Sequence, residues 1–536
     1  MRASDTKWWG WGAKDKRTEL SHGALEMLGA RLGEGEPNPA PERDRVRLPA
    51  AAKVPRSVER AVGPENVLTR DEDRLRHSTG MSYPDLIRLR SGDIERAPDA
   101  VVMPASHEHV AAVLEACARK GVAVVPFGGG TSVVGGVEPD RGGFERVIAL
   151  DLARMRDVEV DERSLTARLG PGLSGPDAEC ALSDAGMTLG HFPQSFEYAT
   201  IGGFAATRSA GQASSGFGRF DALVTALRLA APAGELTTVE TPHTAAGPSL
   251  RELVLGSEGA FGVITDVTAR VRPVPVATRH EAWMAADFAS GAEIVRGLAQ
   301  RDALPDVVRV SDREETGVSM AMAGASGVAT AYLKLRRRAD GCIMIVGWGG
   351  EREAVARRRA LAERALRSGG AVSLGARPGR SWHRGRFEGP YLRDALLDRG
   401  YLVDTLETAH TWSRLGELHE AVIGAVRGAL EGQGTPGIAF GHLSHAYRDG
   451  ASLYFTLIAR RRPGDEIAQW RAVKEAASHA IVSTGGTITH HHGIGRDHMP
   501  YMRAEVGEVG METLQAVKER LDPAGIMNPG KLVDPT

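Results

Sequence analysis

Three adjacent histidines, His490, His491 and His492, followed by Gly493-Ile494-Gly495, form the sharpest polar motif of the sequence. Three neighbouring side chains cannot all face one way on a strand, whereas a loop bounded by glycine allows two of them to point into a cavity. Because imidazole titrates near neutral pH, such a pair is suited to general acid–base catalysis. A surface run of histidines is the alternative, and the internal position and glycine flank favour catalysis.

Three segments rich in Gly, Ser and Thr could hold an anionic ligand. The first, Pro126-Phe127-Gly128-Gly129-Gly130-Thr131-Ser132, follows a strand directly, and its glycines let backbone N–H groups surround an anion. It matches neither GxGxxG nor a P-loop, and alone it would be read as a tight turn. The other two segments span 194–211 and 256–264. Together the three could enclose a long ligand with a diphosphate, such as a dinucleotide.

The elements around these segments predict an α+β organisation. Residues 99–106 read as a buried strand, 108–121 as an amphipathic helix ending at Gly121, and 122–127 as a second strand, which makes a β-α-β unit. Further strands continue to about residue 275, and alternating helices and strands follow to about residue 500. We expect an N-terminal extension packing on the core (1–96), a first domain (97–275), a second domain (276–504), and a C-terminal segment returning to the first (505–536).

Composition excludes several classes of protein. The chain of 536 residues carries 66 Lys and Arg against 68 Asp and Glu, a balance that argues against nucleic-acid binding. Its three cysteines are widely spaced, so neither a disulfide framework nor a cysteine zinc site is expected. No apolar run is long enough to span a bilayer and no signal peptide is evident, so we expect a cytoplasmic protein, with peripheral membrane contact left open. The abundance of Arg, Ala and Gly is typical of a GC-rich bacterial genome.

The order and spacing of these motifs resemble the vanillyl-alcohol-oxidase flavoprotein superfamily. The resemblance rests on PFGGGTSVVGG, QSFEYATIGGF with TRSAG, GSEGAFGVI and the terminal LDPAGIMNPGKL. Within the superfamily, KWWGWGAKD, FEGPYLRD, DTLETAHTWSRL and THHHGIGRDHM are most similar to the alkyl-dihydroxyacetonephosphate synthase family, which makes the ether bond of ether lipids. The resemblance implies an α+β fold: a PCMH-type FAD-binding domain of two α+β subdomains plus a second α+β substrate (cap) domain.

The resemblance also implies FAD as the cofactor. No His or Cys stands in the first loop where some relatives bond the flavin covalently, so noncovalent FAD is expected. The diphosphate would lie on 126–132, and the rest of the cofactor on the other loops. The residues implied are Pro126, Phe127, Gly128, Gly129, Gly130, Thr131, Ser132, Gln194, Ser195, Tyr198, Ala199, Thr200, Gly203, Thr207, Arg208, Ser209, Ala210, Glu258, Gly259, Gly262, Val263 and Ile264.

The same resemblance implies the catalytic and substrate residues. Tyr454 matches the family's active-site tyrosine, the histidine run matches its histidine loop, and Arg309 and Arg393 match its functional arginines. Arginine suits a substrate phosphate because its planar fork makes paired hydrogen bonds; Arg393 also counts as catalytic, and His445 as substrate-binding. The implied reaction exchanges the acyl chain of acyl-dihydroxyacetone phosphate for a fatty alcohol through a flavin N5 adduct, without net redox change, in a homodimer with an apolar tunnel for the chains.

Three alternatives remain open. Related FAD-dependent D-2-hydroxyacid dehydrogenases can bind a divalent metal through two His and a Glu, but here Tyr454 falls near the second His and His491 replaces the Glu. We therefore predict no metal, while His442, His445 and the histidine run could still form a different nitrogen-rich site. The other rivals are an FAD-dependent oxidase or dehydrogenase of a hydroxy acid or alcohol, and a flavin-binding protein without catalysis.

Overall fold

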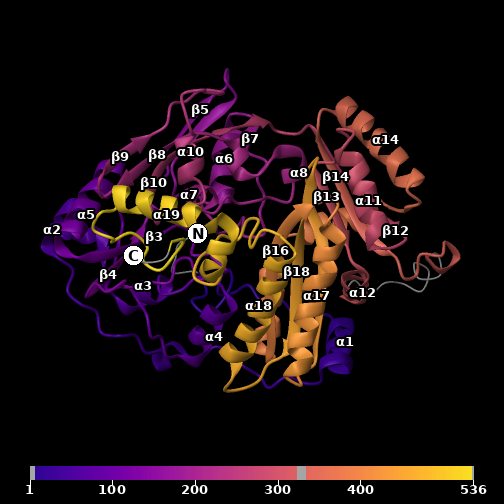
Figure 1. Ribbon diagram of the computed structural model, residues 1–536, viewed down its shortest axis with the longest axis horizontal. Helices are drawn as coiled ribbons and strands as arrows, with labels where there is room; N and C mark the ends of the chain where they lie inside the picture. The colour runs from indigo at the N-terminus through magenta and orange to yellow at the C-terminus, as the bar shows by residue number, and fades with distance from the viewer. Residues whose placement is uncertain (1–5, 323–332, 534–536) are drawn as a thin grey trace.

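The computed structural model describes residues 6–322 and 333–533, which form two α+β lobes (Figure 1). The predicted α+β class is confirmed. The first lobe opens with a four-stranded sheet in the order β1-β2-β4-β3, in which β2 and β3 both run parallel to β4. The predicted β-α-β unit is therefore present, with β4 between its two strands. These strands are β1 (Val67–Leu68), β2 (Ala100–Val102), β3 (Val122–Phe127) and β4 (Arg146–Asp151).

The helix of this unit, α5 (His107–Lys120), shows how the sequence sets the element. Ser106 caps its first turn, and Gly121 ends it in the left-handed conformation with φ of 59°. Val110, Val113 and Cys117, at helical spacing, are fully buried against the sheet. Because α5 returns the chain to the sheet's edge, β3 delivers the first glycine-rich loop directly from its carboxyl end.

A second, wholly antiparallel sheet of the first lobe has the order β5-β6-β10-β8-β9. The second glycine-rich segment leads into α7 (Ile201–Ala206) and the third leads into β10 (Val263–Arg270). The other strands are β5 (Val158–Asp161), β6 (Thr166–Leu169), β8 (Val224–Ala231) and β9 (Gly234–Thr237), with β7 (Met187–Thr188) paired to β11 (Arg272–Pro273) beside them. The helices here are α6 (Gly175–Asp184), α8 (Ser214–Phe217), α9 (Phe220–Leu223) and α10 (Leu250–Val254).

The second lobe is built on a seven-stranded antiparallel sheet in the order β15-β12-β14-β13-β17-β18-β16. Its strands are β12 (Ala277–Ala285), β13 (Val307–Ser311), β14 (Cys342–Gly350), β15 (Val372–Gly375), β16 (Tyr401–Thr411), β17 (Gly437–Ala446) and β18 (Gly450–Arg460). Two long helices, α17 (Leu415–Gly432) and α18 (Glu466–Ser483), lie against β16 and β18 (Figure 1). The remaining helices are α11 (Phe288–Ala299), α12 (Arg313–Met322), α14 (Arg352–Ser368), α15 (Ala376–Gly385) and α16 (Gly389–Asp398).

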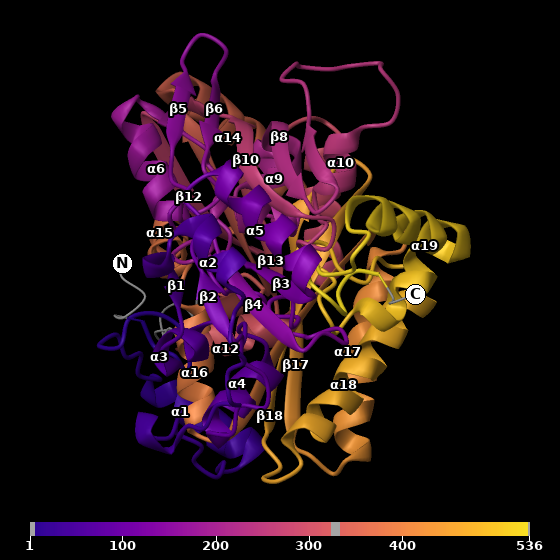
Figure 2. The ribbon, with the colours of Figure 1, turned by 90° about the vertical axis from the view of Figure 1, so that its left-hand side faces the viewer.

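Both ends of the chain tie the lobes together. The N-terminal segment carries α1 (His22–Leu32), α2 (Arg56–Val62), α3 (Asp71–Arg76) and α4 (Tyr83–Ser91), and α1 lies beside α12 and α16 of the second lobe (Figure 2). At the other end, α19 (Met502–Leu521) crosses the first lobe, and the backbone of Val124 in β3 pairs with Ile526 and Asn528. Within the described ranges, no helix is long and apolar enough to cross a membrane.

Candidate active site

A cavity of about 580 Å³ lies where the glycine-rich loops face strands β16, β17 and β18. The residues expected to hold the cofactor line this cavity, with the exceptions of Tyr198 and Arg208. Arg309, Arg393, His445, Tyr454, His491 and His492 line it too. The volume is in the range of small-molecule and cofactor sites in proteins. Cofactor and catalytic candidates from segments more than 300 residues apart thus share one space.

The contact between the first two loops depends on glycine. A Cβ on Gly129 would lie 1.9 Å from the backbone oxygen of Tyr198, and a Cβ on Gly128 would lie 2.3 Å from Thr200 Oγ1. Glycines held this closely present bare backbone to the cavity, as the binding of a diphosphate requires. The first loop therefore fits the diphosphate of FAD.

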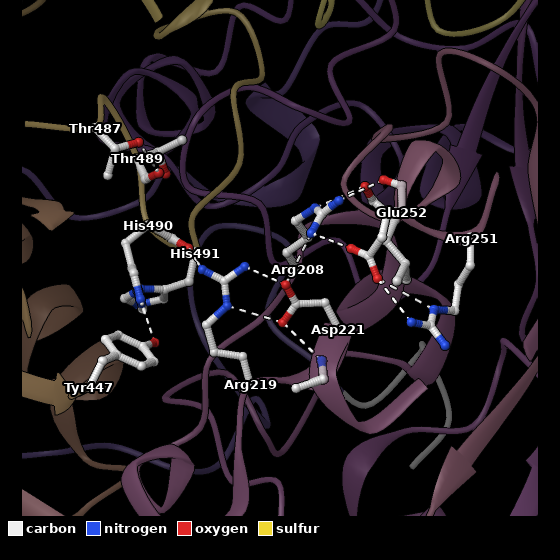
Figure 3. A network of polar contacts seen from close by, with 12 residues as sticks. Arg208, Arg219, Asp221, Arg251, Glu252, Tyr447, Thr487, Thr489, His490 and His491 are labelled. Atoms are coloured by element: carbon white, nitrogen blue, oxygen red, sulfur yellow. Dashed lines mark hydrogen bonds and ion pairs between the residues drawn. The ribbon is translucent and has the colours of Figure 1, made fainter. Parts of the chain in front are cut away.

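The structure does not bring the side chain of Arg208 to the cavity, contrary to the sequence-based expectation. Its guanidinium donates to Asp221 Oδ2 at 3.1 Å, to Glu252 Oε2 at 2.9 Å, and to the carbonyl of Leu255 at 3.0 Å (Figure 3). These carboxylates hold the cation on the far side of the second loop. Tyr198 also turns away, packing edge-on against Trp11 with ring centroids 5.1 Å apart. Both residues support the loops from outside.

The histidine loop is held through its backbone by a single buried carboxylate. Glu407, in β16, accepts the N–H groups of His490 at 2.6 Å, His491 at 3.0 Å and His492 at 2.9 Å, and the hydroxyl of Thr489. Burial by itself would raise the pKa of Glu407, but the neighbouring histidines, His491 above all, hold this pKa well below its usual range. Glu407 is therefore ionised and fixes the loop mainly through its backbone N–H groups, while His491 Nδ1 also lies 3.3 Å from Oε2.

A second carboxylate holds the other end of the loop. Glu258, in the third glycine-rich segment, accepts the N–H of Ile494 at 2.7 Å and the N–H of Gly495 at 3.1 Å. Burial raises its pKa to about 7. The histidine loop is thus fastened to the second lobe through Glu407 and to the first lobe through Glu258, so the position of its imidazoles depends on how the two lobes meet.

The three imidazoles have different surroundings. His490 Nδ1 lies 3.0 Å from His491 Nδ1, and His490 Nε2 lies 2.7 Å from the hydroxyl of Tyr447, so His490 points out of the cavity (Figure 3). His491 and His492 line the cavity beside Tyr454, their rings 6.3 and 5.6 Å from its ring. Burial lowers the pKa values of His490 and His492 to about 3, so both are neutral near pH 7.

The cavity wall carries buried polar atoms that have no hydrogen-bond partner among the described residues: His445 Nδ1, Glu315 Oε2, and Nε and Nη2 of Arg393. Arg393 donates through Nη1 to the carbonyl of Met81 at 2.7 Å, and its Nη2 only approaches Asp394 Oδ1, at 3.5 Å. An unpaired buried guanidinium edge is costly unless a ligand pairs it. Arg393 is therefore arranged to receive an anion.

His445 reaches the cavity through an irregularity in the sheet. The register of β17 against β18 shifts between Ser444 and Ala446, and His445 takes a positive φ of 23°. Its ring lies beside those of His490 and His491, with centroids 5.4 and 5.2 Å away. Burial holds the pKa of His445 well below its usual range. A strained backbone thus presents a neutral imidazole to the site.

Arg309 is already paired inside the site. Its Nη2 donates to Glu315 Oε1 at 2.5 Å, and His442 Nδ1 lies 3.1 Å from the same oxygen. Although burial would raise the pKa of Glu315, Arg309 and His442 lower it far below the usual value. His442 in turn stacks on Tyr454, with ring centroids 5.1 Å apart. Arg309 thus anchors the wall behind Tyr454 while part of its guanidinium faces the cavity.

Removal of metal ions is expected to leave turnover unchanged. Glu407, His490 and His491 each offer a ligand atom within 4.8 Å of the others, so a metal could be imagined there. However, the Glu407 carboxylate already accepts three donors on Oε1 and one on Oε2, and His491 Nδ1 lies 3.3 Å from Oε2, so its oxygens are engaged within the protein. Turnover before and after dialysis against EDTA, with metal analysis of the protein, tests this. A stoichiometric metal whose removal abolishes activity would contradict it.

Sequence reasoning missed Glu407, Tyr447 and Trp11. Glu407 lies within DTLETAHTWSRL. An acidic residue inside an apolar strand, with no basic residue next to it, is the signal that could have revealed it. Trp11 belongs to the N-terminal aromatic cluster, and it lines the cavity from a segment that resembled an extension. For Tyr447, which contacts the histidine that points away from the cavity, the sequence gave no signal.

Two family models match the chain: "FAD binding domain" over residues 98–240 and "FAD linked oxidases, C-terminal domain" over residues 274–532. The alkyldihydroxyacetonephosphate synthase of Dictyostelium discoideum is 33% identical over 86% of this chain and 77% of the relative. That of Trypanosoma brucei brucei is 34% identical with the same coverage. Both are eukaryotic, so they lend no support to the bacterial source expected from composition.

A solved structure of an alkyldihydroxyacetonephosphate synthase superposes on this one with a TM-score of 0.85 at 28% identity, covering 99% of each chain. The fold, the glycine-rich cavity and the histidine loop described above therefore occur together with full-length similarity in sequence and structure. The protein binds FAD, and it belongs to the alkyldihydroxyacetonephosphate synthase family.

Proposed function

We propose that the protein exchanges the acyl chain of acyl-dihydroxyacetone phosphate for a fatty alcohol, forming an ether and releasing a fatty acid. The observation that carries the proposal is the continuity of one cavity, which runs from the glycine-rich loops past His491, His492 and Tyr454 to an apolar wall. FAD, when bound, supplies an electron-accepting ring that lets a carbon–oxygen bond be exchanged without net redox change.

The apolar wall suits an acyl or alkyl chain. It is formed where α1 of the N-terminal segment meets α12 and α16, and its side chains include Ala24, Met27, Leu28, Val318, Met322 and Leu396. Burying each CH₂ group of a ligand contributes about 0.8 kcal/mol. A wall of this kind therefore favours long chains over short ones and gives the predicted tunnel its lining.

Narrowing the cavity along this wall is expected to lower activity with long alcohols more than with short ones. In Met27→Trp, the larger ring occupies space that a long chain would fill, and such overpacking typically costs about 1–3 kcal/mol. We expect kcat/KM for hexadecanol to fall roughly 10-fold while kcat/KM for octanol changes little. The matched control is Leu25→Trp, on the same helix but exposed to solvent. Equal losses for both alcohols in Met27→Trp would contradict the assignment.

The polar residues then have separate tasks. Arg393, with its unpaired guanidinium edge, and Arg309 bind the substrate phosphate, and His445 contributes a neutral nitrogen beside them. His491 Nδ1 is engaged by His490 and Glu407, which leaves Nε2 to take a proton from the carbon that bears the acyl ester. Burial raises the pKa of Tyr454, so its phenol stays protonated and assists the departing carboxylate.

An anaerobic titration of the purified holoenzyme, followed by visible spectroscopy, tests the proposal. We expect palmitoyl-dihydroxyacetone phosphate to bleach the flavin band, and hexadecanol to restore it with an ether product and without an electron acceptor. Reduction by D-lactate or D-2-hydroxyglutarate, reversed only by an acceptor, would instead establish a dehydrogenase. Retention of turnover in Tyr454→Phe would refute the role given to its hydroxyl.

Three finer properties belong to the proposal. FAD is held noncovalently, so denaturation with trichloroacetic acid should release the flavin into the supernatant. The protein acts as a homodimer, which light scattering of the holoenzyme measures directly. It also contacts membranes peripherally, since both of its chain-bearing substrates reside there; co-sedimentation with phospholipid vesicles tests this contact.

A further inference from the structure

The proposed exchange produces one proton per turnover, and this proton needs a way out. An ester and an alcohol become an ether and a carboxylic acid, which ionises at neutral pH. The base takes one proton from the substrate carbon and one from the alcohol hydroxyl, and the carbon regains one when the ether forms, so one proton is left in excess. The base that first receives the substrate proton, His491, lines the cavity in which the cofactor and the substrate would lie. This inference rests on the proposed function, because that reaction defines the proton to be moved.

Hydrogen-bonding distances continue from His491 away from the cavity. His491 Nδ1 lies 3.0 Å from His490 Nδ1, and His490 Nε2 lies 2.7 Å from the Tyr447 hydroxyl (Figure 3). Both contacts are within the range in which a proton passes between heteroatoms. Two successive short contacts through opposite nitrogens of one imidazole make a path across the ring of His490.

The path ends at a second cavity. Tyr447 is half-buried and lines a space of about 530 Å³ on the outer side of the histidine loop, together with His410, Thr411, Asp449 and Glu505. The side chains of Thr411, Asp449 and Glu505 are exposed, so water reaches this cavity. Among the described residues, Tyr447 lines this cavity and no residue of the histidine loop does.

Neighbouring groups hold the path in place. Arg219 donates to the backbone oxygen of His490 at 3.0 Å and is itself paired with Asp221 at 2.6 Å (Figure 3). The indole of Trp412 donates to the backbone oxygen of Tyr447 at 3.2 Å. The two carbonyl contacts fix the backbone of His490 and Tyr447, and Arg219 also makes a hydrogen bond to the Tyr447 phenol.

We propose that His490 and Tyr447 carry one substrate proton per turnover, in excess of the one returned to the carbon, from His491 to water in the second cavity. The substrate proton binds His491 Nε2, and the hydrogen on His491 Nδ1 moves to His490 Nδ1. The hydrogen on His490 Nε2 moves to the Tyr447 oxygen, and the phenolic hydrogen leaves to water. Each group gains and loses one proton, so one proton crosses and no charge accumulates. Return of the tautomers through the same contacts resets the path.

Glu407 is the other group near enough to accept the proton of His491 Nδ1, but its contacts argue against a route to solvent through it. His491 Nδ1 also lies 3.3 Å from Glu407 Oε2. The carboxylate, however, already accepts the N–H groups of the whole histidine loop, and a proton bound there would displace one of them. Glu407 is also buried, with no route of its own to solvent. It stabilises a charged His491 electrostatically, and the proton leaves through His490.

Variants of Tyr447 test the path in the holoenzyme. Tyr447→Phe keeps the ring but blocks His490 Nε2, and we expect kcat to fall roughly 100-fold, the lower end of what a positioned proton-transfer group contributes. Tyr447→Ala should be similarly slow but should recover as imidazole is added, because the second cavity then admits a small base to His490. Imidazole should not rescue Tyr447→Phe. Tyr401→Phe, which removes a hydroxyl that donates to the Gly33 carbonyl in the N-terminal segment, is the matched control.

A spectroscopic readout does not depend on turnover. In ¹⁵N-histidine-labelled holoenzyme, the hydrogen between His490 and His491 should give a slowly exchanging, far-downfield N–H resonance that shifts in Tyr447→Phe and not in Tyr401→Phe. If the wild type forms no ether, the proposed function fails, and the imidazole rescue is measured instead on hydroxy-acid oxidation, which also releases a proton. Wild-type turnover in Tyr447→Phe, or a slow Tyr447→Ala that imidazole leaves unchanged, overturns the path.

Discussion

Replacing His491 by alanine is expected to lower kcat about 1,000-fold, within the range that a general base contributes, while the protein keeps its fold and its FAD. The imidazole lines the cavity beside Tyr454, and its Nε2 is the nitrogen left to receive the substrate proton. The loop itself is held through backbone N–H groups by Glu407, and alanine retains those groups. The loss should therefore appear in chemistry and not in stability.

Steady-state kinetics, the flavin absorbance per protein and the thermal midpoint together measure this outcome. The matched control is His243→Ala, which removes an exposed imidazole that does not line the cavity and should change none of them. Added imidazole should partly restore His491→Ala, because the missing ring leaves a space of its own size in the cavity. A variant that retains a tenth or more of kcat would exclude His491 as the base.

Local sequence patterns predicted the elements that carry the cofactor loops. The apolar run of β3, the capped amphipathic helix α5 and the glycines that follow are each determined within about 15 residues of chain, where propensity and periodicity suffice. The histidine loop was also interpretable, because three adjacent side chains cannot share one face: two line the cavity and His490 does not. The roles of Tyr454, Arg309 and Arg393, in contrast, came from resemblance.

The parts that escaped prediction depend on long-range contacts. Glu407 meets the histidine loop across more than 80 residues, and nothing local to β16 reveals which donors would surround a buried acid there. Arg208 was placed at the cofactor by its motif, yet Asp221 and Glu252 attract its guanidinium to the other side of the loop. Which group pairs with a buried charge depends on tertiary structure. Here such pairing fixes the histidine loop through Glu407 and turns Arg208 away from the cavity through Asp221 and Glu252.

Replacing Glu407 by glutamine is expected to lower both stability and turnover. The new amide NH₂ would face backbone N–H donors, and the loop would lose the charge that orders it; breaking such a buried set typically costs about 3–5 kcal/mol. An imidazole displaced by about 1 Å can lower turnover 100-fold, so kcat should fall by at least this factor. Chemical unfolding of the holoenzyme at pH 7 and initial rates at saturating substrate measure the two losses.

The pH dependence separates this role from a general packing defect. The pKa of Glu407 is depressed in the folded protein, so its stabilisation is present above the unfolded value near 4.3 and is lost as pH falls below that value towards the folded pKa. Wild-type stability should therefore decline on acidification through this window more steeply than that of Glu407→Gln. Glu475→Gln, at an exposed position on α18, should follow the wild type. Parallel profiles for wild type and Glu407→Gln would show that the carboxylate is not the charge that holds the histidine loop.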